Sequence, residues 1–359
     1  MLKKDIDYKK RIVIAVVLAA VRLVLANSQM MLIFPFGAPI DDDLYFSWAQ
    51  NIAAGNWLGE YNYLTLSKYP FFGIYLAIVH KLGIPYLVAN CMMWIGLSVL
   101  TVMAFSPVVK NNWHKLALFT ALIYNPSTYA EHTLRVYRDS IFPILCVAFF
   151  VALAGWALRL KKDIRYNIGY IITAGIALGL AWISREDGYW LVPFGIAAIT
   201  ICIMYILIDK ELNKKLTRIA CAAIPAVITA TFVLMICAMN YKYYGLFTLS
   251  DFSDGAFADC FGAMTTLSHE EWHPLISVPE DVRMRMYEEC PTFVQFYDYV
   301  DNDESRVKKA IQHGVWVTIN LVSFIGGSDV RHRNWVYMKA GQRQNHCGHS
   351  LLQKLKLCA

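Results

Sequence analysis

Long apolar runs alternate with short polar stretches over most of the chain before residue 243. Most of these runs contain about 20 residues, the length that an α-helix needs to cross the hydrocarbon core of a bilayer. The runs that we predict to span a membrane are residues 12–34, 84–105, 115–125, 140–160, 168–184, 189–208 and 219–241. The third run is short and is expected to continue past Pro126. The pattern predicts an all-α, multi-pass membrane domain over residues 1–243, with about seven spans.

The composition agrees with this interpretation. Of the 359 residues, 57% are hydrophobic and 17% are charged, and the mean hydropathy is +0.41. A soluble domain carries about 25% charged residues, so a soluble fold is excluded for most of the chain. The net charge of +6 comes largely from Lys and Arg in short loops between apolar runs, which is a signal of membrane topology. We therefore expect a lipid bilayer, and no nucleic acid, among the partners.

The basic residues orient the predicted helices. The chain begins MLKKDIDYKKR, and membrane proteins keep such basic segments in the cytoplasm. The first apolar run is too long for a signal peptide and contains Arg22, so we predict an uncleaved helix with its N-terminus inside. The basic loops all face the cytoplasm if residues 71–82 do not cross the membrane. That run is too short to span, and we predict an interfacial or re-entrant helix there.

The other loops then face outward and hold charges of both signs close to apolar sequence. These loops are residues 35–83, 127–140 and 184–189. Their charged residues include Asp41, Asp42, Asp43, Lys68, Arg135, Arg138, Asp139, Arg185, Glu186 and Asp187. Residues 244–359 also fall outside and are polar and mixed, with helix-start patterns at 268–271 and at Pro279. They predict a small, α-rich extracytoplasmic C-terminal region.

The stretch PIDDDLYFSWAQNIAAG, residues 39–55, predicts an amphipathic helix that lies in the outer membrane interface. Its apolar face consists of Leu44, Tyr45, Trp48, Ala49, Ile52 and Ala53. Gly55 is expected to end the helix. One aspartate suffices as an N-cap, and we assign that role to Asp43. Asp41 and Asp42 then remain for chemistry.

The outward charges suit the transfer of a group from a membrane-bound phosphate. A carboxylate can take a proton from a hydroxyl, and such general-base catalysis contributes about 10²–10⁴-fold. Arginine binds two phosphate oxygens at once through its forked guanidinium. Arg135 and Arg138 are three residues apart and are predicted to share a helix face, with Lys68 and Arg185 in neighbouring loops.

Two of these arginines also have a simpler interpretation. Arg138 is followed directly by Asp139, and Arg185 by Glu186 and Asp187. Local ion pairs would then neutralise both guanidiniums without any role in binding. The sequence leaves the two interpretations open.

A family resemblance adds to the first interpretation. The pattern D-D-x-x-Y-x-x-x-A, formed by Asp41, Asp42, Tyr45 and Ala49, is followed by Gly55-x-Trp57 and by Lys68-Tyr69-Pro70. It resembles the first outer loop of the GT-C glycosyltransferases, in the style of the protein O-mannosyltransferase and aminoarabinose-transferase branch. The chain departs from that branch by D-D in place of D-E and by K-Y-P in place of K-P-P, and the third aspartate shifts the register by up to one residue.

The resemblance implies a GT-C-like helix bundle and an inverting transferase that uses a polyprenyl-phosphate sugar at the outer face. It makes Asp41 the catalytic base and Asp42 its partner, and it places Lys68 near the donor phosphate. The residues predicted to bind substrate are Lys68, Arg135, Arg138, Arg185, Glu186 and Tyr45. Family members usually have more spans, from which we expect that the chain lacks part of their length.

The sequence therefore predicts a glycosyltransferase in the plasma membrane of a bacterial cell, with its active site facing outward. The acceptor is a hydroxyl of a lipid, a glycan or a protein. We expect no cofactor, and a divalent cation at the aspartates is the alternative, because carboxylate oxygens are the ligands that such ions prefer.

The sequence also leaves two alternative functions open. A transporter or flippase of a lipid-linked anionic glycan should hold charged residues at mid-membrane depth, where only Arg22 qualifies. A membrane zinc metalloprotease would use His269 and His273 of HEEWH, which fits H-E-x-x-H. Ser268 and Pro274 enclose that motif, which is more typical of a helix start with Glu271 as a capping residue.

Overall fold

The computed structural model describes residues 2–32, 39–62, 64–250, 253, 262–268, 270, 278–289, 293, 294 and 297. Over these residues the chain is α-helical, and its one extended pairing is an isolated bridge between Leu32 and Arg135. The predicted all-α class is confirmed for this part of the chain.

The helices follow the apolar runs closely. Their bounds are α1 Leu2–Ser28, α2 Pro39–Ala54, α3 Phe71–Lys81, α4 Tyr86–Phe105, α5 Asn112–Ile123, η1 Pro126–Tyr129, α6 Glu131–Leu134, η2 Arg138–Ser140, α7 Phe142–Ala157, α8 Ile164–Trp182, η3 Gly188–Trp190, α9 Leu191–Ile208, α10 Lys215–Cys221, α11 Ile224–Tyr244 and α14 Glu280–Glu289.

Six stretches of the described chain are long and apolar enough to cross a membrane. They are Lys9–Ser28, Tyr86–Phe105, Arg138–Ala157, Ile164–Trp182, Gly188–Ile208 and Lys215–Tyr244. Their length and composition mark the chain as a multi-pass membrane protein.

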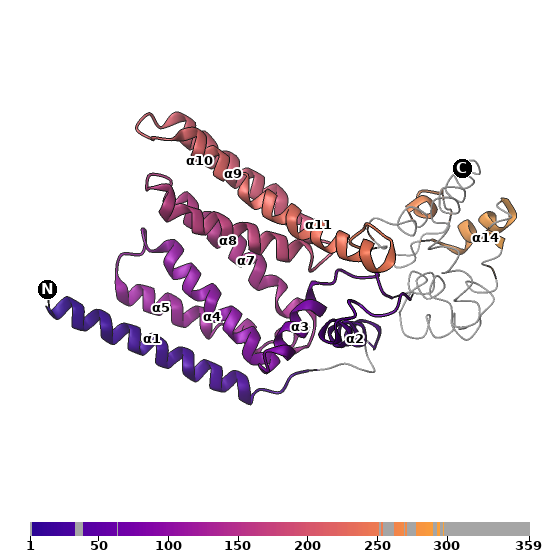
Figure 1. Cartoon of the computed structure of the whole chain (residues 1–359), viewed down its shortest axis with the longest axis horizontal. Helices are drawn as coiled ribbons and strands as arrows, with labels where there is room; N and C mark the ends of the chain where they lie inside the picture. The colour runs from indigo at the N-terminus through magenta and orange to yellow at the C-terminus, as the bar shows by residue number, and fades with distance from the viewer. Residues whose placement is uncertain are drawn as a thin grey trace. The chain divides into compact units, whose positions relative to one another are not determined.

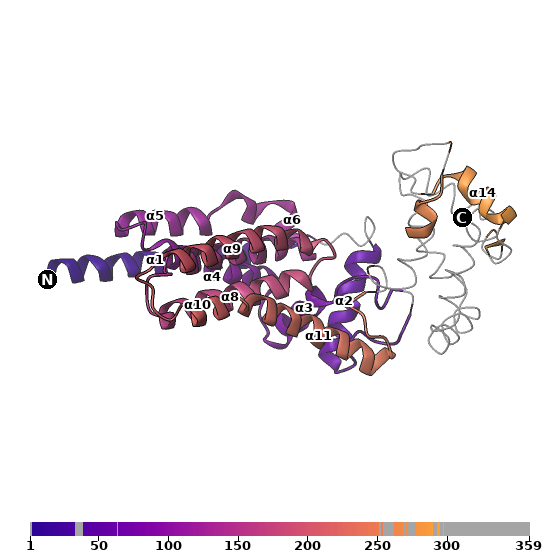
Figure 2. The same ribbon diagram turned by 90° about the horizontal axis from the view of Figure 1, so that it is seen from above.

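The short third run forms α5, which ends at Ile123 and does not continue through Pro126 as predicted. At 12 residues, α5 extends only about 18 Å along its axis, less than the ~30 Å hydrocarbon core. The chain continues in the same direction through η1 and α6, and α5 packs against α1 and α4 (Figures 1 and 2). This segment therefore still connects the two ends of the bundle.

The loops of the first unit lie at the two opposite ends of the helix bundle (Figure 1). At one end, the basic end, Arg11 lies 4.9 Å from the Trp113 ring and Lys161 forms a 3.3 Å ion pair with Asp209. At the other end, the site end, the Tyr86 hydroxyl donates to the carbonyl of Arg135 over 3.0 Å. The predicted separation of the loops into two groups agrees with this arrangement.

Contacts divide the chain into two units. The first unit comprises residues 1–59 and 69–236, and it contains the helix bundle and α2. The second comprises residues 60–68 and 237–359. The boundary predicted at 243/244 lies close to the end of α11, whereas the division falls inside that helix.

The helix α2 has the predicted faces. Leu44, Tyr45 and Trp48 are buried, and Gly55, with φ of +88°, follows its last residue. The apolar face is covered by protein, since the rings of Tyr45 and Phe72 lie 5.2 Å apart and α3 packs against α2. The sequence predicted a helix in the outer membrane interface, and in the structure α3 covers its apolar face.

The N-cap assignment of Asp43 is wrong. The helix begins at Pro39, a residue favoured in the first turn because it lacks an N–H that would need a partner. Asp41 and Asp42 therefore lie in the first turn, where the helix dipole favours negative charge. Asp43 is the fifth helical residue and its side chain is exposed.

Gly175 and Gly179 of α8 allow the close approach of α11. A Cβ atom at Gly175 would lie 3.0 Å from Cα of Pro225 and 2.9 Å from Cδ1 of Ile228, whereas one at Gly169 meets nothing within 4 Å. Gly175→Ala is expected to destabilise the protein by about 1–3 kcal/mol because the backbone of α11 cannot yield to the added carbon. Gly169→Ala should leave stability unchanged or raise it, and thermal unfolding in detergent compares the two.

Candidate active site

The first contact of the site joins α2 to the segment after α6. Nη2 of Arg135 lies 2.6 Å from Oδ1 of Asp42, and Nε lies 3.4 Å from Oδ2. The Asp42 side chain has 0% exposure, while that of Arg135 is 25% exposed. The hydrogen bond to Asp42 is the main cause that raises the pKa of Arg135. The sequence predicted Asp42 as a catalytic partner of Asp41. In the structure its carboxylate is buried in an ion pair with Arg135.

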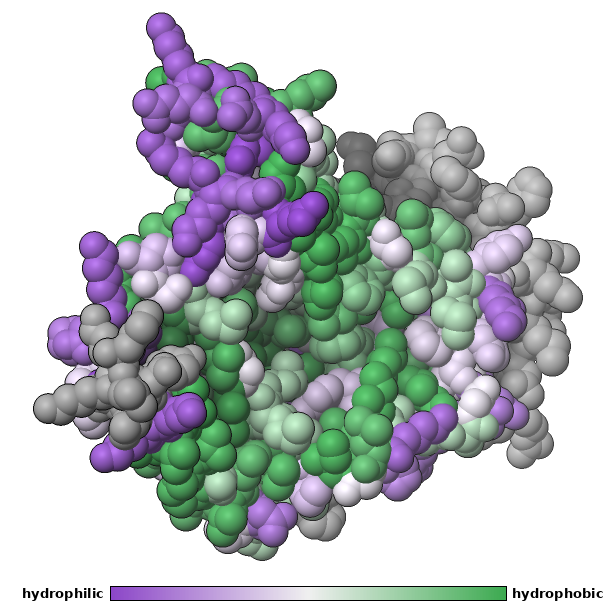
Figure 3. Space-filling view, turned by 60° about the vertical axis from the view of Figure 1, so that its left-hand side comes forward, coloured by the Kyte–Doolittle hydropathy of each residue, from purple (hydrophilic) through white to green (hydrophobic). Residues whose placement is uncertain are grey.

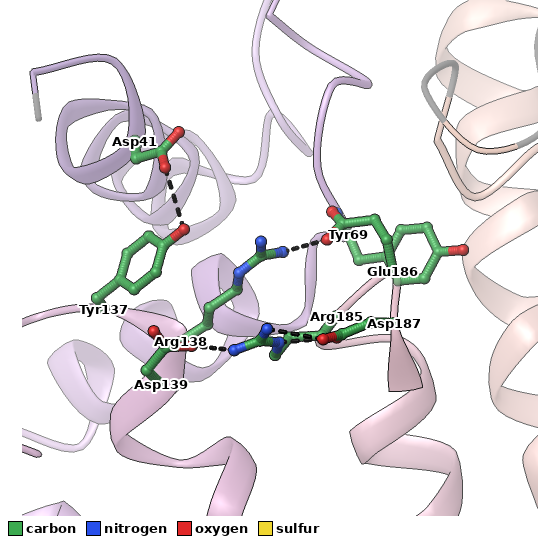
Figure 4. Close-up of polar contacts among 8 residues, drawn as sticks. All are labelled: Asp41, Tyr69, Tyr137, Arg138, Asp139, Arg185, Glu186 and Asp187. Atoms are coloured by element: carbon green, nitrogen blue, oxygen red, sulfur yellow. Dashed lines mark hydrogen bonds and ion pairs between the residues drawn. The ribbon is translucent and has the colours of Figure 1, made fainter. Parts of the chain in front are cut away.

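The second contact involves Asp41, one residue earlier. The Tyr137 hydroxyl donates to Oδ2 of Asp41 over 3.0 Å, and Asp41 is half-buried (Figure 4). Burial, together with the nearby carboxylate, raises the pKa of Tyr137 to about 12. The phenol therefore stays protonated at neutral pH and can orient one oxygen of Asp41.

Tyr137 also holds the arginines on either side of it. The Arg135 guanidinium lies 4.6 Å from its ring centroid and that of Arg138 lies 5.6 Å from it. Such cation–π contacts stabilise a partly desolvated pair by about 0.5–2 kcal/mol. The ring thus connects the Asp41 carboxylate to two cations.

The third contact joins two loops and the start of α3. Nη1 of Arg138 donates to Oε2 of Glu186 over 2.5 Å, and Oε1 of Glu186 accepts the backbone N–H of Tyr69 over 3.2 Å (Figure 4). The backbone N–H of Phe71 donates to the carbonyl of Ile183 over 3.2 Å. The loop before α9 therefore fixes the chain where it enters α3.

The fourth contact centres on Arg185. Its Nε and Nη2 donate to the two oxygens of Asp187, both over 2.8 Å, and its Nη1 pairs with Asp139. The hydrogen bond from Arg185 is the main cause that lowers the pKa of Asp187 below its usual 3.8. Because the folded-state pKa is lowered, the contribution of this pair is present above pH ~4 and is lost as the pH falls through the folded-state value.

Two sequence-based expectations are corrected by these contacts. Arg135 and Arg138 do not share a helix face, because α6 ends at Leu134 and residues 135 and 137 are extended. The local pair of Arg138 with Asp139 is wrong, since Arg138 binds Glu186 and Asp139 binds Arg185. The alternative pair of Arg185 with Asp187 is confirmed.

Tyr45 lies behind these contacts. Its side chain is fully buried and its ring is 5.6–5.8 Å from the rings of Trp48 and Tyr137. Burial raises its pKa far above the usual range for tyrosine. Its hydroxyl makes no hydrogen bond to a described residue, and among the charges around it Arg138 opposes the effect of burial on the pKa most. Tyr45 therefore supports the site from within the protein, and it does not present a surface to substrate in this conformation.

Lys68 belongs to residues 60–68 of the second unit, whereas the other predicted site residues belong to the first. Seven of the eight are gathered there: Asp41, Asp42, Tyr45, Arg135, Arg138, Arg185 and Glu186. Lys68 directly precedes Tyr69, whose backbone is held by Glu186.

Sequence reasoning missed Tyr137 and the backbone of Tyr69. The signal for Tyr137 was the order Arg-Val-Tyr-Arg at 135–138, a tyrosine between two arginines in an outward loop. Nothing in the sequence pointed to a backbone N–H of residue 69, because its bond to Glu186 spans 117 positions.

Mid-membrane Arg22 has local partners. Its Nε donates to the carbonyl of Ile123 over 3.1 Å, and its guanidinium lies 4.6 Å from the ring of Tyr129. It is buried and binds the last carbonyl of α5, where the helix dipole favours a positive charge. These contacts favour a packing role.

Within the described residues, no group of three or more His, Cys, Asp or Glu side chains is arranged to hold a metal ion. The motif residues His269, Glu271 and His273 lie outside the described residues.

Removing the Tyr137 hydroxyl tests its bond to Asp41. Tyr137→Phe keeps the ring packing and is expected to lower the free energy of unfolding by about 1 kcal/mol. Tyr189→Phe, at a tyrosine that is 64% exposed, should have no effect. Chemical denaturation of the two variants in detergent checks this, and equal stabilities would contradict the role of the hydroxyl. The bond needs the phenolic proton, so its contribution should be present below pH ~10 and lost as the pH rises through about 12.

The two aspartates of the first turn of α2 thus differ in kind. Asp42 is fully buried and bound by a guanidinium, while Asp41 is half-buried and bound by a neutral phenol. A carboxylate of the second kind can reach a substrate hydroxyl and accept its proton. Comparisons with protein families, with curated proteins and with solved structures found no match for this chain.

Proposed function

We propose that the protein is an integral-membrane, inverting glycosyltransferase. It moves a sugar from a polyprenyl-phosphate donor to an acceptor hydroxyl on the outer face of a bacterial plasma membrane. The observation that supports this best is the half-buried Asp41, which Tyr137 orients beside a network of three arginines. The resemblance of the Asp41–Pro70 stretch to the first outer loop of GT-C enzymes points to the same chemistry.

In the proposed reaction, Asp41 accepts the proton of the acceptor hydroxyl as the hydroxyl oxygen bonds to the anomeric carbon. The bond between that carbon and the donor phosphate oxygen breaks on the opposite face, which inverts the configuration. The proton is left on Asp41, and the polyprenyl phosphate leaves with the electron pair of the broken bond.

The leaving phosphate needs cations. Arg135 and Arg185 are 25% and 27% exposed in their side chains, and both bind carboxylates in a two-point geometry. A phosphate offers the same pair of oxygens and can replace the more exposed carboxylate, that of Asp187. Arg138, which Glu186 holds in place, completes the proposed set within the first unit, and the role of Lys68 rests on the resemblance alone.

The test is donor consumption. Membranes that contain the full-length protein, mixed with native membranes as the acceptor source, are incubated with radiolabelled polyprenyl-phosphate sugars, one sugar at a time. We expect one sugar to pass into product, and only when the protein is present. If every donor stays intact, the proposal is contradicted. Label that crosses the bilayer without chemical transfer would favour a flippase.

A further inference from the structure

The basic end of the bundle carries a strong excess of positive charge. The two loops around residues 158–165 and 209–218 contain eight Lys or Arg and three Asp or Glu residues. Lys161 is paired with Asp209, and Asp163 caps α8 through the N–H of Arg165. The side chains of Lys162, Arg165 and Lys214 are exposed and have no ion pair to a described residue.

A hollow lies beside these loops, between the end of α7, the start of α8 and α10. It is shallow: the space of about 240 Å³ between these elements includes much that is open to the surroundings, and the enclosed part has room for about one water molecule. Its lining comprises Trp156, Leu160, Ile164, Asn167, Ile168, Ile171, Arg218 and Cys221. Figure 3, in which this end comes forward, shows hydrophilic side chains at the rim of the molecule with hydrophobic ones behind them.

The apolar wall of the hollow runs along α8, in the direction that an acyl chain of a bound lipid would take. Ile164, Ile168 and Ile171 occupy one face of the first two turns of α8, so the apolar wall runs about 10 Å inward from the start of the helix. Ile168 is 39% exposed and the hollow has apolar walls, as an acyl chain requires. A soluble anion would gain nothing from this wall.

Arg218 places a cation at the mouth of the hollow. Its Nε donates to the carbonyl of Asn213 over 3.0 Å and its Nη1 to that of Leu160 over 2.6 Å. These two bonds fix the guanidinium while Nη2 makes no hydrogen bond to a described residue. The structure thus sets a positioned donor where a headgroup phosphate would lie.

We propose that this hollow binds an anionic phospholipid. The phosphate contacts Nη2 of Arg218 and the side chains of Lys162 and Arg165, and one acyl chain lies against Ile164 and Ile168. Basic pockets between membrane helices on the positively charged side are suited to such lipids. The site lies at the opposite end of the bundle from Asp41 and does not depend on the proposed transferase activity.

The test is native mass spectrometry of the full-length protein released from vesicles of equal parts phosphatidylglycerol and phosphatidylcholine. Wild type is expected to retain phosphatidylglycerol about tenfold or more over phosphatidylcholine. Each surface cation contributes about fivefold, so Lys162→Gln/Arg165→Gln should remove most of the preference. Lys110→Gln/Lys115→Gln, with the same loss of charge just before α5 and in its first turn, should keep it.

A second variant tests the hollow itself. Ile168→Trp fills it without changing the charge and should also reduce the retained phosphatidylglycerol several-fold. Equal retention of the two lipids by wild type overturns the proposal. So does an unchanged preference in Lys162→Gln/Arg165→Gln or in Ile168→Trp. An equal loss in the Lys110/Lys115 control also overturns it, because the effect would then be diffuse surface charge.

Discussion

Arg135→Ala is expected to lower the free energy of unfolding by about 3–5 kcal/mol, the cost of removing one partner of a buried ion pair. The Asp42 side chain has 0% exposure and receives two hydrogen bonds from Arg135. Water cannot reach Asp42 to replace them without a local opening of α2. The variant should therefore yield little folded protein, and what folds should melt well below wild type.

The control is an arginine of the same network whose carboxylate partners are exposed. Arg185→Ala removes the pairs with Asp139 and Asp187, which are 39% and 53% exposed, so the loss should be about 1 kcal/mol or less. Thermal and chemical unfolding in one detergent compares the variants. Equal destabilisation by the two substitutions would contradict the burial argument. The double variant Asp42→Leu/Arg135→Met should recover much of the loss, since no charge is then left buried.

Much of the fold follows from the local pattern. The apolar runs predicted the membrane helices because a segment in a medium without water must satisfy its backbone hydrogen bonds internally, which a helix does. The face of α2 was predictable from the spacing of Leu44, Tyr45 and Trp48, and its end from Gly55. Since lipid and protein are equally apolar, the sequence could not tell that α3 covers this face.

The partners within the site could not be predicted in the same way. Arg138 and Asp139 are adjacent, yet the turn of η2 separates them, and each binds a residue of the loop before α9. These pairs span 46–48 positions, so they depend on how α7 and α8 bring two loops together. The extended backbone at Arg135 and Tyr137 was not predictable, because no glycine or proline in this segment indicates a break in the helix.

Asp41→Asn is expected to slow sugar transfer by about 10²–10⁴-fold, the contribution of a general base. The amide keeps the size of the side chain, and its oxygen can still accept the Tyr137 hydroxyl hydrogen bond. Stability and donor binding should therefore stay close to wild type while the rate of the chemical step falls. The matched control is Asp43→Asn, in the same helix at an exposed position.

The most direct measurement is the single-turnover rate of transfer from the radiolabelled donor, with Asp41→Asn and Asp43→Asn assayed side by side at equal amounts of folded protein. The proposal predicts a rate for Asp41→Asn at least about a hundredfold below that of Asp43→Asn, with the latter equal to wild type. Equal rates in the two variants would contradict the role of Asp41 as the base.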